Sequence, residues 1–503
     1  MKREAGILLS ITSLSSPYGI GCMSAEVFRF VDFLRDSGQR VWQLLPAGPT
    51  GFGDSPYQTF SSFAGNPYWI DLEELIRDGL LQREECDGTD WGQDPCRVDY
   101  GKVYEGRKKL LRLAYLRSGK VRDEVWKNFE CEQKDWLEDY TLFMALKEHQ
   151  GGLSWNRWEE KLRRRDPDAL KMAKEELWEE IDFQKWMQFL FFHQWNRLHD
   201  YARKQEIKLL GDLPIYVAED SADVWSHPEL FLLNGDGIPL RVAGCPPDEF
   251  SPLGQLWGNP LYSWEAHENT GYEWWIGRIS HARRLYDSVR LDHFRGFDAY
   301  YSIPYGAPDA REGKWEKGPG MELFRAVHEA LGEGEYIAED LGYLTDSVRK
   351  LVRDSGFAGM KILQFGLGGG DPEHLPIFYS ENTVAYSGTH DNPTLWEWLS
   401  GRSEEEWMTI REEVWNFDAP REKLVDACLA LLMRSRSNLC IVPIQDYLRM
   451  GEEGRMNRPG AAQGNWSWRL REDELTVSLA QKIRRLTESG RRLGDHDPTR
   501  REG

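Results

Sequence analysis

Apolar residues follow two periods along the chain, and the two alternate. In residues 24–37, apolar side chains recur at intervals of three and four positions, and Ser24 can cap the start of the helix that this pattern predicts. The short apolar run 40–45 follows and leads into a Gly/Pro turn. The same order returns when the helical pattern 345–356 precedes the apolar run 360–365. The chain is therefore predicted to consist of repeated helix and strand units.

Eight apolar runs have the length and composition of strands. Strands that alternate with helices form a parallel sheet, and eight of them predict an α/β fold closed as a (β/α)8 TIM barrel. A doubly wound open sheet would give a similar pattern. The predicted strands are residues 6–11, 40–45, 207–217, 288–294, 336–341, 360–365, 383–387 and 438–444.

Two segments are too long for single connections of such a barrel. Residues 68–200, between the second and third strands, carry helical patterns and predict a mainly helical inserted subdomain. Residues 218–286 are rich in Gly, Pro and Trp and predict a second, loop-rich insertion. The charged residues 484–503 are expected to form a flexible tail, so residues 1–503 are interpreted as one catalytic barrel with insertions.

Charge and cysteine usage exclude several classes of function. The net charge of −20 repels nucleic acid and anionic membranes. The chain contains no run of about 18–20 apolar residues, which is the length that a membrane-spanning helix needs. The N-terminus lacks the pattern of a secretory signal, and the seven scattered cysteines form no CxxC pair. A cytoplasmic location is therefore expected. The 22 tryptophans are compatible with sugar stacking or with a large core, and we weight the two equally.

Three predicted strands end in ionisable residues: Asp292 in VRLDHFR, Glu339 in IAEDLG and Asp391 in SGTHDN. Their spacing assigns them to strands four, five and seven, and the carboxyl ends of barrel strands converge on one site. A single strand-end carboxylate is more often a helix cap or an ion-pair partner than a catalyst. Three at barrel spacing favour a catalytic site, which the pattern alone would describe as that of a barrel hydrolase or lyase.

The neighbours of these carboxylates predict different roles. Cleavage of a glycosidic bond with retained configuration requires one carboxylate as nucleophile and one carboxylic acid as proton donor. Arg290 is expected to keep Asp292 ionised, whereas burial and the adjacent Asp340 are expected to raise the pKa of Glu339. Asp391, with His390, could hydrogen-bond sugar hydroxyls in an oxocarbenium-like transition state.

No cofactor and no metal ion are expected. The glycine-rich residues 366–370 lack the GxGxxG order, no P-loop is present, and the histidines include no HExxH pair.

The three segments resemble the catalytic signatures of the α-amylase clan, and nearly the whole chain resembles family 77 of the glycoside hydrolases, the amylomaltases or 4-α-glucanotransferases. The resemblance is weaker over residues 80–180 and the tail. It rests further on residues 13–21 (SLSSPYGIG), 49–58 (PTGFGDSPYQ), 211–218 (GDLPIYVA), 246–248 (PPD), 254–260 (GQLWGNP), 456–460 (MNRPG) and 465–466 (NW).

The resemblance implies roles for the strand-end residues. Asp292 resembles the nucleophile of the family, Glu339 its general acid and base, and Asp391 its transition-state stabiliser. Arg290 and His390 match residues of the same pocket.

The resemblance also implies substrate contacts outside these segments. Tyr57 matches an aromatic residue that stacks on the sugar, and Asp212 matches a residue on strand three at the edge of the pocket, where a supporting role is equally open. Asp248, Gln255 and Trp257 match a loop that covers the cleft, although Trp257 could merely anchor it.

The implied activity is transfer of an α-1,4-glucan segment to the 4-hydroxyl of an acceptor glucan or glucose, by a retaining double displacement, with maltooligosaccharides as partners. A hydrolase of the same clan is the nearest alternative, and a non-catalytic glucan-binding barrel is a second. Two departures concern the acceptor side: Gly366–Gly370 follow Phe365 where many relatives have an acidic residue, and Glu249 replaces a common aromatic residue.

Overall fold

The computed structural model describes residues 1–51, 53–119, 123–248, 251–342, 344–416, 420–461 and 463–494. Its centre is a sheet of eight parallel strands in the order β10-β11-β12-β1-β2-β3-β6-β9. The strands are β1 (Glu4–Leu8), β2 (Val41–Gln43), β3 (Lys208–Leu213), β6 (Ser288–Leu291), β9 (Tyr336–Ala338), β10 (Gly359–Ile362), β11 (Thr383–Tyr386) and β12 (Leu439–Pro443).

The two edges of this sheet meet. Ile337 in β9 forms a parallel bridge with Ala358, which lies immediately before β10. The amide of Ala338 donates to the carbonyl oxygen of Ala358 over 2.8 Å, and the amide of Ala358 donates to that of Tyr336 over 3.2 Å. This closure confirms the predicted (β/α)8 barrel and excludes the doubly wound open sheet. All eight predicted strands form, each within or overlapping its predicted run.

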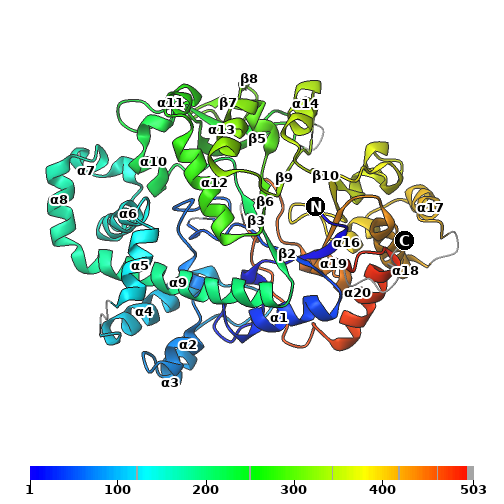
Figure 1. The fold of residues 1–503 in the computed structure, drawn as a ribbon, viewed down its shortest axis with the longest axis horizontal. Coiled ribbons are helices and arrows are strands. Elements are labelled where there is room, and N and C mark those ends of the chain that lie inside the picture. The colour runs from blue at the N-terminus through cyan, green and yellow to red at the C-terminus, as the bar shows by residue number, and fades with distance from the viewer. Residues whose placement is uncertain are drawn as a thin grey trace.

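Helices surround the barrel (Figure 1). Helix α1 (Ala25–Asp36) begins as predicted, because the side chain of Ser24 accepts a hydrogen bond from the amide of Glu26. The other helices that follow barrel strands are α13 (Met321–Leu331), α14 (Asp346–Ser355), α15 (Leu363–Gly366), α16 (Leu395–Ser400), α17 (Glu404–Glu413), α18 (Arg421–Arg434), α19 (Ile444–Leu448) and α20 (Val477–Ser489).

The connection between β2 and β3 is mainly helical and extends to one side of the barrel (Figure 1). Its last helix, α9, packs against α1 and β3. Aromatic rings fill its core, as where Trp195 stacks on Phe191 at 5.9 Å. The helices are α2 (Leu72–Arg77), α3 (Arg83–Asp87), α4 (Tyr100–Arg117), α5 (Glu124–Glu132), α6 (Leu137–His149), α7 (Glu160–Arg163), α8 (Pro167–Glu176) and α9 (Trp178–Lys204).

Many of the tryptophan side chains are buried in the core. Eight of the 22 have almost fully buried side chains, and they are distributed over the barrel and both insertions. The core interpretation therefore accounts for a large part of the aromatic content. These residues are Trp42, Trp69, Trp155, Trp195, Trp225, Trp275, Trp407 and Trp468.

The connection between β3 and β6 contains more regular structure than the loop-rich prediction implied. Its strands join two strands that follow β6 in an antiparallel sheet of order β5-β4-β7-β8. The strands are short, and a glycine interrupts β4 and β5, so the sequence carries a weak strand signal there. The elements are β4 (Arg241–Cys245), β5 (Gln255–Pro260), β7 (Ala299–Pro304), β8 (Lys314–Lys317), α10 (Ala222–Ser226), α11 (Trp264–Asn269) and α12 (Glu273–Leu285).

The prediction of a flexible tail from residue 484 is wrong for residues 484–494. Helix α20 extends to Ser489 and packs against α1 and α18. Arg492 is fully buried, and its guanidinium donates to the carbonyl oxygens of Met433 and Ser435 over 2.8 and 2.9 Å. A charged, arginine-rich run predicts exposure to solvent, because the sequence does not show which distant carbonyl groups will accept hydrogen bonds from the arginines. Residues 495–503 lie outside the described residues.

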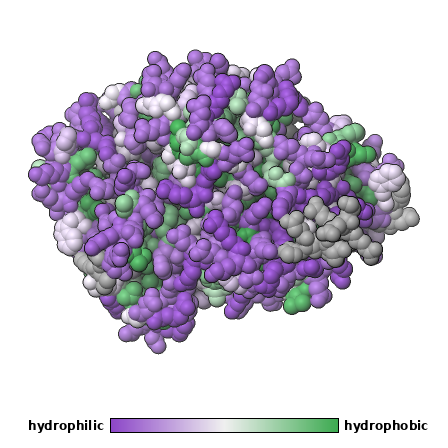
Figure 2. Space-filling view, in the orientation of Figure 1, coloured by the Kyte–Doolittle hydropathy of each residue, from purple (hydrophilic) through white to green (hydrophobic). Residues whose placement is uncertain are grey.

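The face of the molecule seen in Figure 2 is predominantly hydrophilic, with small scattered apolar areas. Within the described part of the chain, no helix combines the length and hydropathy that crossing a membrane requires.

Candidate active site

The backbone places Asp292 and Glu339 side by side at the carboxyl ends of neighbouring strands. In the β6–β9 pair, Leu291 is in register with Ala338, and each carboxylate is the next residue. The amide of Asp292 donates to the carbonyl oxygen of Leu213 and that of Glu339 to the carbonyl oxygen of Leu291, both over 3.0 Å. The sheet register therefore determines the positions of both backbones.

Arg290 links two carboxylates beneath the site. It pairs with Asp212 across β3 and β6, and its Nη1 donates to both carboxylate oxygens of Asp212 over 2.7 Å. The same Nη1 lies 3.0 Å from Oδ1 of Asp292. The Arg290 side chain is 4% exposed, whereas that of Asp292 is 24% exposed. Asp292 is thus held by a buried cation and remains partly exposed to solvent.

Glu339 has a different environment. Its Oε2 accepts a hydrogen bond of 2.7 Å from the amide of His293. That amide points at Glu339 because His293 adopts the left-handed backbone conformation, with φ of 45°. A residue other than glycine costs free energy in this conformation and is often found so at functional sites. No cation is among the hydrogen-bond or ion-pair partners of Glu339 in the described structure.

Burial raises the pKa of both carboxyls. Burial is the largest cause in each case, and it raises the pKa of Glu339 to about 8 and that of Asp292 to about 7. Arg290 opposes both shifts, and it also hydrogen-bonds Asp292 directly. Arg290 lowers the pKa of Asp292, as expected, while burial and the charges of Asp212 and Asp391 raise it. Arg290 contacts Asp292 directly and is not among the hydrogen-bond or ion-pair partners of Glu339 in the described structure, so the cation favours the ionised form most at Asp292.

Tyr57 connects the Arg290 side of the site to His390. Its hydroxyl donates to Oδ2 of Asp212 over 2.7 Å and lies 2.9 Å from Nε2 of His390. The Tyr57 and His390 rings stack with centroids 5.2 Å apart, and Trp466 lies 5.8 Å from each. Burial lowers the pKa of His390, which favours its neutral form.

Asp391 lies on the loop after β11 and is more exposed than Asp292. Its side chain is 45% exposed, and its Oδ2 lies 3.4 Å from Nε2 of His390. Asn457 donates from its side-chain amide to Oδ1 of Asp391 over 2.6 Å. Sequence reasoning assigned no role to Asn457 or Trp466, although both belong to the motifs that carry the family resemblance. Only that resemblance could have singled them out, because neither follows a strand.

The β4–β5 hairpin brings two of its three predicted residues near the site. The edge of Trp257 meets the His293 ring at 4.8 Å and 87°, and its indole N–H donates to Oε1 of Gln255 over 3.0 Å. Asp248 lies exposed at the hairpin tip, where its carboxylate accepts the amide of Ser251 over 2.6 Å. Asp248 therefore shapes the turn. Glu249 lies outside the described residues.

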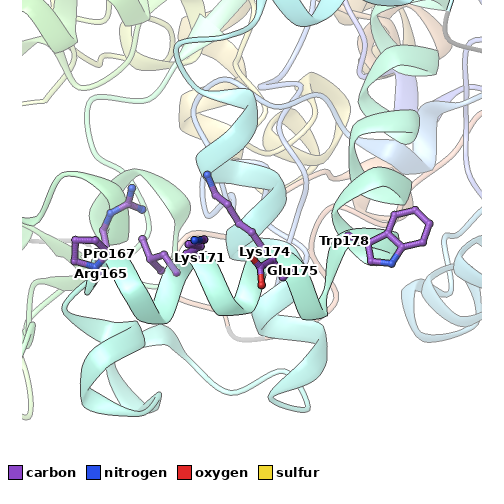
Figure 3. A pocket seen from close by; sticks show the side chains of 7 residues that line it. Arg165, Pro167, Lys171, Lys174, Glu175 and Trp178 are labelled. Carbon is purple, nitrogen blue, oxygen red and sulfur yellow. The ribbon is translucent and has the colours of Figure 1, made fainter.

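A cavity outside the barrel has a different lining. A cavity of about 740 Å³ lies between α8 and the start of α9 (Figure 3), and Glu175 is its single acidic lining residue. Arg165 and Lys174 line it but are already paired with Asp139 and Glu138. In the described residues, no group of three or more His, Cys, Asp or Glu side chains could hold a metal ion.

Comparisons with known proteins agree with this geometry. The sequence model of the 4-alpha-glucanotransferase family matches residues 9–476. A 4-alpha-glucanotransferase of Clostridium butyricum is 45% identical over 95% of this chain and 99% of its own length. A 4-alpha-glucanotransferase of Thermus thermophilus is 44% identical over 98% of this chain and 100% of its own.

A solved structure shows the same fold over the whole chain. The amylomaltase of Streptococcus agalactiae, in complex with acarbose, superimposes with a TM-score of 0.94 at 38% identity. The alignment covers 98% of this chain and 100% of that one.

Fold and site together define an enzyme class first: a (β/α)8-barrel enzyme with carboxylates as its acid and base groups. The chain belongs to the 4-alpha-glucanotransferase family, family 77 of the glycoside hydrolases. The predicted family, fold and 4-alpha-glucanotransferase activity are thereby confirmed, and the comparisons do not favour the hydrolase alternative.

Proposed function

We propose that the enzyme transfers a segment of an α-1,4-glucan to the 4-hydroxyl of an acceptor glucan or glucose by double displacement. Asp292 is the nucleophile, Glu339 the general acid and base, and Asp391 the stabiliser of the transition state. The unequal environments of Asp292 and Glu339 support this division most directly. Asp292 is paired directly with the Arg290 cation, which favours its ionised form, whereas Glu339 has no cation among its contacts in the described structure and burial raises its pKa.

In the first step, a carboxylate oxygen of Asp292 attacks the anomeric carbon as the glycosidic bond breaks. Glu339 gives its proton to the departing 4-oxygen, so the reducing-side fragment leaves as a neutral alcohol. The products are a covalent glycosyl ester on Asp292 and an ionised Glu339. The loss of negative charge at Asp292 lowers the proton affinity of Glu339, which prepares it to act as a base.

In the second step, the 4-hydroxyl of the acceptor loses its proton to Glu339 and attacks the same anomeric carbon. The ester bond breaks and Asp292 regains its charge. Two inversions retain the α configuration. Asp391 and neutral His390 are assigned to the hydroxyls of the reacting sugar, where their hydrogen bonds strengthen as positive charge develops on the ring.

The remaining predicted residues are assigned to substrate binding and its support. Tyr57 offers a ring face to the sugar, and Asp212 orients both Tyr57 and Arg290. Trp257 and Gln255 lie on the hairpin assigned to cover the cleft, and Asp248 shapes its tip. Residues 1–503 act as one catalytic barrel in this proposal, and the helical insertion supports the cleft from the side. Maltooligosaccharides are the proposed substrates.

Incubation of the purified enzyme with maltotriose alone tests the proposal. Disproportionation gives glucose together with a ladder of longer maltooligosaccharides, while the total number of reducing ends stays constant. The matched variant Asp292→Asn keeps shape and loses the nucleophile, so it should lose about 10⁴-fold or more of the rate. Glucose and maltose alone, with rising reducing ends, would make the enzyme a hydrolase. Turnover retained in Asp292→Asn would refute the nucleophile assignment.

A further inference from the structure

The loop between β11 and α16 carries both His390 and Asp391, and its position determines where they meet the sugar. Asp391 is 45% exposed, so packing alone does not fix its carboxylate. Its nearest hydrogen-bond partner, Asn457, belongs to another loop. The path of residues 387–395 must therefore be determined by contacts of the loop backbone.

One buried carboxylate holds both ends of this loop. Asp446 lies in α19, directly after the eighth barrel strand, and is 1% exposed. Its Oδ2 accepts the hydroxyl of Ser387 over 2.6 Å, at the point where the chain leaves β11. Its Oδ1 accepts the amide of Leu395 over 2.6 Å, at the first residue of α16. Ser387 and Leu395 are both fully buried.

Short-range bonds make the segment between these two anchors compact. The side-chain oxygen of Asn392 accepts the amide and the hydroxyl of Thr389 over 2.8 and 3.0 Å. The amide of Asp391 donates to the Thr389 hydroxyl over 3.3 Å. Two contacts also hold the middle of the segment: the amide of Asn457 donates to the carbonyl oxygen of His390 over 3.2 Å, and the side-chain amide of Gln364 to that of Pro393 over 2.9 Å. Because the segment is compact, loss of both Asp446 contacts at its ends is expected to displace Asp391.

The chemistry of Asp446 fits a positioning role better than a packing role. Removal of a carboxylate from water is costly, and an apolar side chain at this depth would avoid that cost. Burial raises the pKa of Asp446 to about 6, with the bonds from Leu395 and Ser387 opposing the rise. The hydrogen bonds from Ser387 and Leu395 are the contribution that the Asp446 carboxylate makes in return, and both donors lie at the ends of the loop that carries Asp391.

We propose that Asp446 is a positioning residue for glucan transfer, which acts by fixing the loop that presents Asp391 and His390 to the sugar. The proposal deepens the function proposed above and rests on the assigned role of Asp391. Asp446 lies too deep to touch substrate and acts through Ser387 and Leu395.

The variants Asp446→Ala and Asp446→Asn separate positioning from general stability. Alanine removes both bonds, and a displacement of Asp391 of about 1 Å is expected to lower kcat about 10²-fold. Asparagine can keep both, because its oxygen accepts the Leu395 amide and its NH2 donates to the Ser387 oxygen. We therefore expect Asp446→Asn to retain kcat within about tenfold, at a cost of one to two weakened hydrogen bonds. KM should change much less than kcat in both.

Asp71 supplies a matched control. It is 2% exposed, its pKa is raised to about 6 by burial, and it caps α2 in the helical insertion by accepting the amide of Glu73. Asp71→Ala should lower Tm with kcat unchanged. If Asp446→Ala behaves as Asp71→Ala does, Asp446 is structural and the proposal fails.

A double-mutant cycle decides whether Asp446 acts through Asp391. Rates are measured with an α-maltosyl fluoride donor, whose good leaving group keeps slow variants measurable. Asp446→Ala should lower kcat far less in the Asp391→Asn background than in the wild type. Equal losses in both backgrounds would overturn the proposal. If Asp391→Asn itself keeps full activity, the assigned role of Asp391 fails instead. Should Asp446→Ala not fold, Ser387→Ala removes one of the two bonds and must show part of the kcat loss.

Discussion

The active site has two halves that are built differently. Asp292 and Glu339 follow the paired strands β6 and β9, their backbones are fixed by ladder hydrogen bonds, and burial raises the pKa of each. Asp391 follows β11 but stands on a loop, is nearly half exposed, and depends on side-chain hydrogen bonds for its position. We call these the sheet half and the loop half.

The difference reflects what each half must do. In the proposed mechanism, the nucleophile and the acid need a fixed separation, which a rigid sheet edge can supply. In the same proposal, Asp391 contacts the sugar hydroxyls from a loop that lies beyond the end of its strand. The sheet half is therefore positioned by backbone register, and the loop half by buried polar contacts. Mutations should affect the two halves in different ways.

The largest effect is expected from the acid in the sheet half. Glu339→Gln removes the proton donor, so kcat on maltotriose should fall about 10²- to 10⁴-fold. Formation of the glycosyl-enzyme from α-maltosyl fluoride should fall much less, because fluoride leaves without a proton. Asp340→Asn is the control, since Asp340 is adjacent but accepts the Met360 amide over 2.6 Å. An equal loss on both donors would contradict the acid role.

The same substitution should change stability in a pH-dependent way. The pKa of Glu339 is raised in the folded state, so the fold loses stability as pH rises from the unfolded pKa toward about 8. The neutral glutamine side chain has no charge to bury, so the Tm of Glu339→Gln should exceed that of the wild type, most clearly at pH 8 and above. A Tm gain that is independent of pH would argue against burial as the cause.

The second effect concerns the cation that joins Asp212 and Asp292. Arg290 lowers the pKa of Asp292, so Arg290→Gln should leave that carboxyl protonated to higher pH. The acid limb of the kcat/KM profile should then move upward by about 1 to 3 pH units. Arg290→Lys restores the charge and should move the limb part of the way back. An acid limb that stays in place would show that Asp292 does not control it.

The third and smallest effect tests the link between the halves. The Tyr57 hydroxyl contacts Asp212 on one side and His390 on the other. Tyr57→Phe removes both contacts and keeps the ring, so kcat should fall about tenfold, the equivalent of one to two net hydrogen bonds. Tyr57→Leu also removes the aromatic ring that can stack on the sugar, so its kcat should be lower still. If the two variants have equal kcat, the hydroxyl accounts for the whole contribution of Tyr57. If kcat of Tyr57→Phe equals that of the wild type, the hydroxyl does not link the two halves.

The sheet half could be predicted from sequence to a much greater extent than the loop half. Strand periodicity is local, so the eight runs and the strand-end residues Asp292 and Glu339 could be identified without tertiary information. That Asp292 and Glu339 lie side by side follows from the barrel fold, which brings the carboxyl ends of neighbouring strands together. The balance of their pKa values could not be predicted, because burial outweighs the adjacent Arg290 and is a property of the folded protein.

The loop half depends on contacts that join distant segments. Tyr57 and His390 are 333 residues apart, and Asn457 is 66 residues from Asp391. No periodicity reports such contacts, so Tyr57 was identified through family resemblance alone. Arg492 was missed for the same reason, because its acceptors belong to a segment 59 residues away.

Trapping of the covalent intermediate tests the central claim most directly, namely that the two carboxyls of the sheet half divide the chemistry. An α-maltosyl fluoride with a second fluorine at C5 of the reacting ring destabilises the oxocarbenium-like transition states of both steps, while fluoride still leaves. Its adduct can then be located by peptide mass spectrometry. We predict one glycosyl ester, on Asp292, and none in Asp292→Asn. An ester on Glu339 or Asp391, or turnover of the reagent through Asp292→Asn at the wild-type rate, would contradict this account.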